Sequence, residues 1–105
     1  MIGRMKQMKL LTKELATKMP PLYSQENVES PDVVCKFFTP DSNWTWYVLE
    51  GQQEGEDWLF FGLVEGFEKE LGYFRLSEIQ SIRGPMGLPV ERDLYFPKTT
   101  LAEVY

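Results

Sequence analysis

The chain has 105 residues, of which 26% are charged and 14% aromatic, and it contains no histidine. A chain of this length fits one domain that buries roughly two-thirds of its unfolded surface, so a core can form without cross-links. The lack of histidine excludes Ser-His-Asp and Cys-His catalysis and imidazole metal ligands. The single cysteine, Cys35, excludes an intramolecular disulfide and predicts a small buried side chain in a reducing compartment.

Charge is unevenly distributed along the chain. Residues 1–19 carry five basic residues and one acidic residue, whereas the remaining 86 carry six basic and fifteen acidic residues. An acidic body repels phosphate backbones, so nucleic-acid binding is disfavoured, and binding through the basic N-terminal arm with Arg4 and Lys6 remains an alternative. No apolar run is long enough for a membrane span or a signal peptide, and we expect a cytoplasmic protein without a membrane partner.

The first predicted element is a short helix that begins after Thr12 and ends before Pro20. Residues 1–7 are expected to form a flexible extension, so that residues 8–105 make a single domain. Thr12 belongs to the residue types that favour the N-cap position of a helix, and proline cannot continue one. Residues 20–32 are typical of a surface connection.

Four strands are predicted next, separated by turn residues: 33–38, 44–50, 58–64 and 72–76. The connections over residues 39–43, 51–56 and 66–70 are short enough to join antiparallel neighbours, which favours a meander. Neither face of the two central strands is plainly polar, so both faces of the sheet need cover. Any part left uncovered would expose aromatic side chains.

The C-terminal part predicts a helix, a loop and an extended segment. Ser77 is expected to cap a helix over residues 78–83, residues 90–96 are expected to be extended, and Thr99 or Thr100 is expected to cap a last turn. The predicted fold class is therefore α+β: a four-stranded antiparallel β-meander with a short N-terminal helix, and a C-terminal helix-loop-extended segment packed on it.

Carboxylates crowd the second predicted turn, where Glu50, Glu54, Glu56 and Asp57 occur within eight residues. Such a group could hold a hard cation or share a proton, although its spacing matches no calcium loop. The alternative is a solvated acidic turn that keeps the sheet soluble. We expect no bound metal and no cofactor.

Glu91 and Arg92 are a second candidate group. Arg92 could bind a carboxylate or phosphate through its forked guanidinium, or it could form an internal ion pair. In the enzyme interpretation, Glu50, Asp57 or Glu91 would act as acid or base on a small molecule, and Arg92 would orient the substrate.

Trp44 and Trp46 are candidate anchors for a protein partner, because tryptophan dominates the energetics of many interfaces. The competing interpretation places both in the core, since a small domain needs aromatic mass. Together with Glu54, Glu56 and Asp57 they form the expected partner-binding set. In one form of this hypothesis the acidic face imitates a phosphate backbone and occupies the groove of a DNA-binding protein.

Longer motifs carry a family resemblance: KLLTKEL (9–15), PPLYS (20–24), KFFTPDSNWTWY (36–47), ELGYF (70–74) and GLPVERDLYF (87–96). With them the chain, from about Met8 onward, resembles the bacterial domain-of-unknown-function family 2958. The resemblance implies small proteins often encoded on plasmids, phages and other mobile elements, sometimes near or within antirestriction and conjugation proteins. It implies no catalytic or binding residue. The expected function is that of a non-enzymatic accessory protein that binds another protein.

Overall fold

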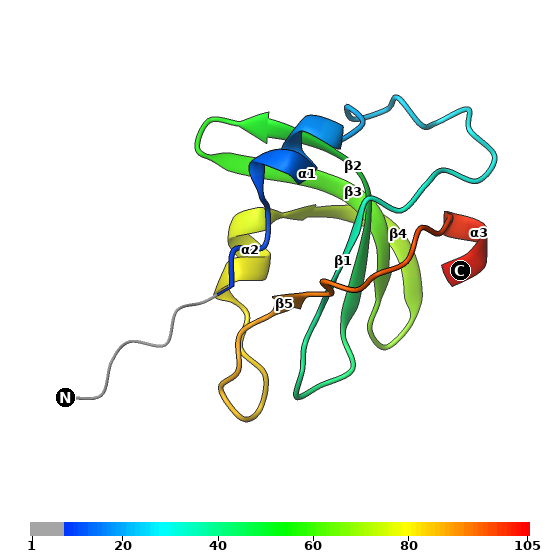
Figure 1. Ribbon diagram of the computed structural model, residues 1–105. Coiled ribbons are helices and arrows are strands. Elements are labelled where there is room, and N and C mark those ends of the chain that lie inside the picture. Colours follow the sequence, from blue (N-terminus) through cyan, green and yellow to red (C-terminus); the bar gives the residue numbers. More distant parts are fainter. Residues whose placement is uncertain (1–7) are drawn as a thin grey trace.

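The computed structural model describes residues 8–105. Within these residues one antiparallel sheet, with strand order β4-β3-β2-β1-β5, is combined with three short helices in an α+β fold (Figure 1). The strands are β1 (Cys35–Phe38), β2 (Thr45–Glu54), β3 (Asp57–Glu65), β4 (Lys69–Arg75) and β5 (Glu91–Arg92). The helices are α1 (Lys13–Lys18), α2 (Leu76–Ser81) and α3 (Leu101–Val104). None of the described helices is long and apolar enough to cross a membrane.

The predicted meander is confirmed for β1 to β4, which pair consecutively and antiparallel, but the sheet has five strands where four were predicted. The fifth, β5, comes from the predicted extended segment and pairs with the outer edge of β1, Phe37 with Arg92 and Phe38 with Glu91. A bare strand edge exposes unpaired N–H and C=O groups, and β5 satisfies part of that edge.

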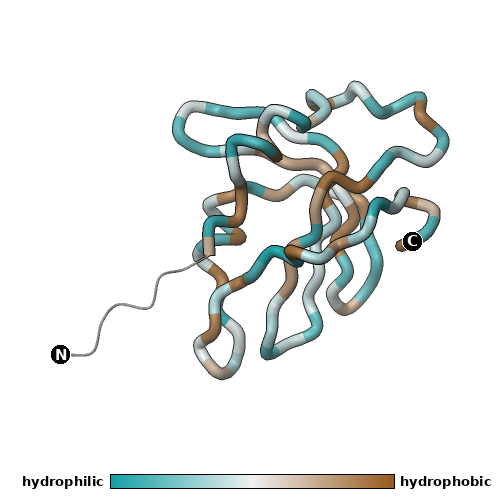
Figure 2. The backbone as a smooth tube through the Cα atoms, viewed as in Figure 1, coloured by the Kyte–Doolittle hydropathy of each residue, from teal (hydrophilic) through white to brown (hydrophobic). Residues whose placement is uncertain are grey.

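The main core lies between the sheet and the helices α1 and α2 (Figure 1). Helix α1 begins as predicted, because the hydroxyl of Thr12 accepts a hydrogen bond from the Leu15 N–H at 3.2 Å. Leu11 and Met19, which flank α1, are buried. Hydrophobic segments concentrate along the central strands (Figure 2), and the strands contribute Phe37, Trp46, Val48, Phe60 and Phe74 to this core.

The opposite face of the sheet, which we call the second face, is covered by residues 20–32 and α3 (Figure 1). Its buried residues include Leu49 and Leu63, which are 2% and 0% exposed. A backbone hydrogen bond of 2.9 Å from the Leu101 N–H to the Pro31 carbonyl joins α3 to this connection.

A β-bulge in β2 decides which residues reach the second face. Val48 pairs with Gly62, whereas Glu50 pairs with Phe61, so Leu49 is an extra residue in β2. Side chains alternate between faces, and one extra residue reverses the alternation beyond it. The bulge therefore turns Glu50 away from the helix-covered core and onto the second face.

The β2–β3 connection is tighter than the predicted turn over residues 51–56. Strand β2 continues to Glu54, and the turn consists of Gly55 and Glu56, with Gly55 at φ +62°. Gly51 lies inside the strand, where an added Cβ would meet Phe60 Cδ1 at 2.8 Å and Met19 Cγ at 3.0 Å. This glycine serves close packing, which a sequence pattern does not distinguish from a turn.

Two predictions concern the ends of the chain. Of the two threonines considered as the last cap, Thr100 takes that role: its N–H donates to Glu103 Oε1 at 3.2 Å in the first turn of α3. The predicted flexible extension, residues 1–7, lies outside the described residues.

Candidate functional site

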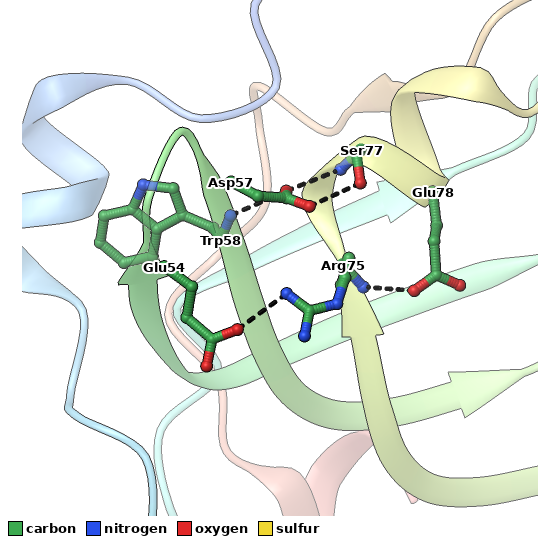
Figure 3. A network of polar contacts seen from close by, with 6 residues as sticks. All are labelled: Glu54, Asp57, Trp58, Arg75, Ser77 and Glu78. Carbon is green, nitrogen blue, oxygen red and sulfur yellow. Dashed lines mark hydrogen bonds and ion pairs between the residues drawn. The ribbon is translucent and has the colours of Figure 1, made fainter.

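The predicted acidic cluster is only partly assembled. Glu54 and Asp57 face each other across the β2–β3 turn, whereas Glu50 lies earlier in β2 and is 4% exposed. Glu54 Oε1 accepts a hydrogen bond of 2.8 Å from Arg75 Nη1 in an ion pair (Figure 3). This contact raises the pKa of Arg75. Two of the three predicted partner-binding carboxylates thus differ in their surroundings. Glu54 has a cationic partner within the chain, whereas Glu56 is an exposed residue of the turn.

Asp57 caps helix α2 from the neighbouring hairpin (Figure 3). Its carboxylate accepts hydrogen bonds from the Ser77 hydroxyl at 2.6 Å, the Ser77 N–H at 3.1 Å and the Trp58 N–H at 2.8 Å. The Ser77 hydroxyl and then the Trp58 N–H lower the pKa of Asp57. Glu78 accepts the Arg75 N–H at 3.1 Å. Because these carboxylates satisfy the first N–H groups, α2 begins before the predicted Ser77 cap, and that prediction was wrong.

The two tryptophans have different environments. Trp46 is 5% exposed and belongs to the core, while Trp44 is half-buried and stacks on it with ring centroids 6.1 Å apart. Phe67, which is 95% exposed, meets the Trp44 ring edge-on at 5.6 Å and 80°. Sequence reasoning missed Phe67, although an aromatic residue inside a polar turn was a signal that could have found it.

Two acidic side chains lie beside the exposed aromatic ring of Phe67. A hollow of about 310 Å³ at this end of the sheet is lined by Trp44, Val64, Phe67, Glu68 and Glu70, and we call these five residues the aromatic–acidic patch. The patch lies at the start of β2, and the β2–β3 turn lies at its other end. At about 3.3 Å per residue, the length of β2 separates the two by roughly 30 Å. The predicted partner-binding residues therefore do not form one surface.

Arg92 fastens the segment before α1 to the sheet. Its guanidinium Nη1 donates to the carbonyls of Lys9 and Leu10, each at 2.9 Å, and its backbone N–H contacts the Met8 sulfur at 3.1 Å. The neighbouring Glu91 is half-buried on β5. The donors of Arg92 are thus directed at backbone carbonyls, and a role for either residue with a substrate stays a prediction.

Glu50 reaches across the second face to the connection over residues 20–32. Its two carboxylate oxygens accept the N–H groups of Tyr23 at 2.9 Å and Gln25 at 2.8 Å. Tyr23 has φ +70°, the one positive φ of a non-glycine residue in the described part of the chain. Backbone in this region costs of order 1–3 kcal/mol for a bulky residue, and here the hydrogen bond to Glu50 holds it in place.

A cleft of about 310 Å³ opens beside Glu50. Tyr73 is its central ring, 6.5 Å from the ring of Tyr23 and 5.0 Å from that of Phe61. The neighbouring Tyr23 hydroxyl raises the pKa of Tyr73, and the charges of Glu50 and Glu26 raise it further. We call this cleft, whose lining includes Tyr23, Glu50, Phe61 and Tyr73, the Glu50 cleft. No sequence pattern predicted it, because the bulge that brings Glu50 to it is a pairing irregularity.

Metal binding was one alternative for the acidic residues. Among residues 8–105, no three acidic or cysteine side chains lie close enough together to hold a metal ion. Cys35 is 4% exposed, and burial raises the pKa of its thiol to about 12. A thiol in this state is a poor nucleophile, as expected for a small core residue.

The profile of the family described as "Protein of unknown function (DUF2958)" matches residues 5–105. Neither the curated proteins nor the solved structures gave a match. The match covers nearly the whole chain, which therefore belongs to this family.

Proposed function

We propose that this member of the DUF2958 family is a non-enzymatic protein that binds a basic partner protein through the aromatic–acidic patch. One observation carries the proposal: Phe67 is 95% exposed in a turn, yet it is oriented by edge-to-face contact with Trp44. A large aromatic side chain that is both exposed and preorganised is typical of an interface anchor. Burial of such a ring against a partner contributes about 1.5–3 kcal/mol.

The charges around Phe67 indicate the kind of partner. Glu68 and Glu70 line the same hollow, and both are exposed. Lys69, which lies between them, is directed elsewhere, because its ammonium group donates to the main-chain oxygens of Val104 and Tyr105. Complementarity of charge favours a partner surface rich in lysine or arginine around an apolar pocket.

The other interpretations of the sequence draw less support. Of the candidate catalytic side chains, Glu50 and Asp57 accept hydrogen bonds from backbone N–H groups, and Arg92 donates to backbone carbonyls. Mimicry of a phosphate backbone would need free carboxylates at the β2–β3 turn, where Glu54 is ion-paired. Binding of nucleic acid through the N-terminal arm rests on sequence alone, because Arg4 lies outside the described residues.

A comparison of two exposed aromatic residues tests the proposal. Phe67→Ser removes the anchor, whereas Tyr95→Ser removes a ring that is 92% exposed beyond the patch, near the opposite edge of the sheet. We expect tagged wild-type protein and Tyr95→Ser, isolated from the native host, to retain the same protein in near-stoichiometric amount, measured by quantitative mass spectrometry. Folded Phe67→Ser should retain at least tenfold less. Equal recovery by all three proteins would refute the patch as the binding site.

A further inference from the structure

Three structural irregularities meet at the Glu50 cleft. The bulge at Leu49 turns Glu50 onto the second face, Glu50 is 4% exposed there, and Tyr23 adopts a positive φ beside it. Each feature costs free energy relative to a regular strand, a solvated carboxylate or an extended backbone. Strained backbone and bulges are concentrated at ligand sites, so their convergence at one cleft favours a binding role.

The charged residues that line the cleft indicate that its ligand carries a positive charge. Besides Glu50, the carboxylates of Glu26 and Glu29 line it, and both of these residues are exposed. Among the described residues that line the cleft there is no lysine or arginine. Glu50 uses one lone pair on each oxygen for backbone N–H groups, and a carboxylate offers about four such sites. The cleft therefore retains acceptor capacity for a cation.

The walls of the cleft indicate that this cation is organic. Tyr23, Phe61 and Tyr73 place aromatic rings along one side, and ring faces attract cations that are partly desolvated. Metal ions such as Ca²⁺ or Mg²⁺ require six or more oxygen ligands, and no three acidic or cysteine side chains of the described residues lie close enough together to hold one. A volume of about 310 Å³ suits a small ligand or one long side chain.

We propose that the Glu50 cleft binds a guanidinium group carried on an apolar stem. A guanidinium is planar, stacks on aromatic rings and donates forked hydrogen bonds to carboxylates, which suits this combination of rings and acids better than a compact, strongly hydrated ammonium. The stem would lie against the partly exposed side chains of Leu71 and Val28. This site is separate from the aromatic–acidic patch and does not depend on the function proposed for it.

Titration of the full-length protein followed by amide NMR tests this site with a matched pair of probes. Butylguanidinium should shift the amide signals of Tyr23 and Gln25, which report directly on Glu50, whereas the neutral isostere butylurea should bind at least tenfold more weakly. Tyr73→Leu should weaken butylguanidinium binding at least fivefold, and Tyr95→Leu should leave it unchanged. If Tyr73→Leu fails to fold, Glu26→Gln, an exposed substitution, should weaken binding about threefold.

The source of the guanidinium is distinguished by two further probes. Binding of both agmatine and the peptide acetyl-Ala-Arg-Ala-amide would identify an arginine side chain of a protein as an accepted ligand, and binding of agmatine alone would identify a free small molecule. Equal affinity for butylguanidinium and butylurea, or full binding by folded Tyr73→Leu, would overturn the proposal.

Discussion

The carboxylate of Asp57 holds the β2–β3 turn to helix α2. It accepts hydrogen bonds from both segments, and these bonds lower its pKa relative to the ordinary value of 3.8. A lowered pKa in the folded state means that the folded protein binds this proton less tightly than the unfolded chain does. The stabilisation is therefore fully present above pH values near the ordinary pKa, and it is lost as the pH falls through the lowered one.

Asp57→Asn tests this assignment by its pH dependence. We expect the variant to have a lower Tm than the wild type at pH 7, because the charge that caps α2 is lost. The difference should shrink as the pH falls below the ordinary value of 3.8, where the wild-type carboxylate becomes protonated. Glu56→Gln, at an exposed neighbouring position, should match the wild type throughout. If the difference in Tm between Asp57→Asn and the wild type does not change with pH, the charge of Asp57 does not stabilise the fold as described.

Gly51 is a second residue whose role is local. An alanine Cβ at this position would press on Phe60 and Met19 in the core, whereas a Cβ at Gly72, in strand β4, would meet no atom within 4 Å. We expect Gly51→Ala to lower the free energy of unfolding by about 1–3 kcal/mol and Gly72→Ala to change it by less than about 1 kcal/mol. Urea denaturation of both variants measures the two free energies of unfolding. Equal changes would show that the core accommodates the added methyl group without extra loss of stability.

At the scale of elements, the bulge in β2 and the connection over residues 20–32 depend on one another. Glu50 provides the acceptors for the Tyr23 and Gln25 N–H groups, and the Gly51 N–H donates to the Pro20 carbonyl at 2.9 Å. The connection has no helix or strand of its own, so these contacts hold it against the sheet.

Glu50→Ala should release this connection without dissolving the sheet. Hydrogen bonds to a charged acceptor contribute about 1.5–3 kcal/mol each, so the amides of Tyr23 and Gln25 should exchange with solvent at least tenfold faster. Hydrogen exchange measured by NMR reports each amide separately. Glu26→Ala, an exposed change in the same connection, provides the control and should leave both rates unchanged. Unaltered exchange in Glu50→Ala would contradict the anchoring role.

Local patterns were sufficient for some elements and insufficient for others. The cap of α1 and the pairing of β1 to β4 follow from contacts between residues close in sequence, and both could be predicted. The start of α2 depends on Asp57, twenty residues before Ser77, and β5 depends on an edge of β1 more than fifty residues away. Such contacts leave no periodic signal in the chain.

For the whole molecule, the distribution of charge and aromatic surface is the feature that bears on function. The described part of the chain carries sixteen acidic side chains against nine basic ones. Acidic residues occur in the aromatic–acidic patch, in the Glu50 cleft and at the β2–β3 turn, where Glu54 and Asp57 already have partners. A field of this sign accelerates association with basic partners and repels nucleic acid.

The candidate site could be predicted from the sequence only in part. Trp44 and Trp46 were both candidate anchors, but the neighbour of Trp44 in space is Phe67, twenty-three residues away, and Trp46 belongs to the core. Glu50 was identified as a notable carboxylate, but its place in a cleft depends on a bulge that shifts register without any glycine or proline at that position. Composition indicates that aromatic residues and acids are abundant, whereas only the pairing of strands decides which of them meet.

Site-specific photo-crosslinking in the native host tests most directly whether the aromatic–acidic patch contacts another protein. Replacing Phe67 with benzoylphenylalanine puts the reactive group at the exposed centre of the patch, and the same replacement of Tyr95 provides the control. We predict one discrete crosslinked protein for position 67 and none of that mass for position 95. The same adduct at both positions, or no adduct at position 67 from folded protein, would contradict binding through this patch.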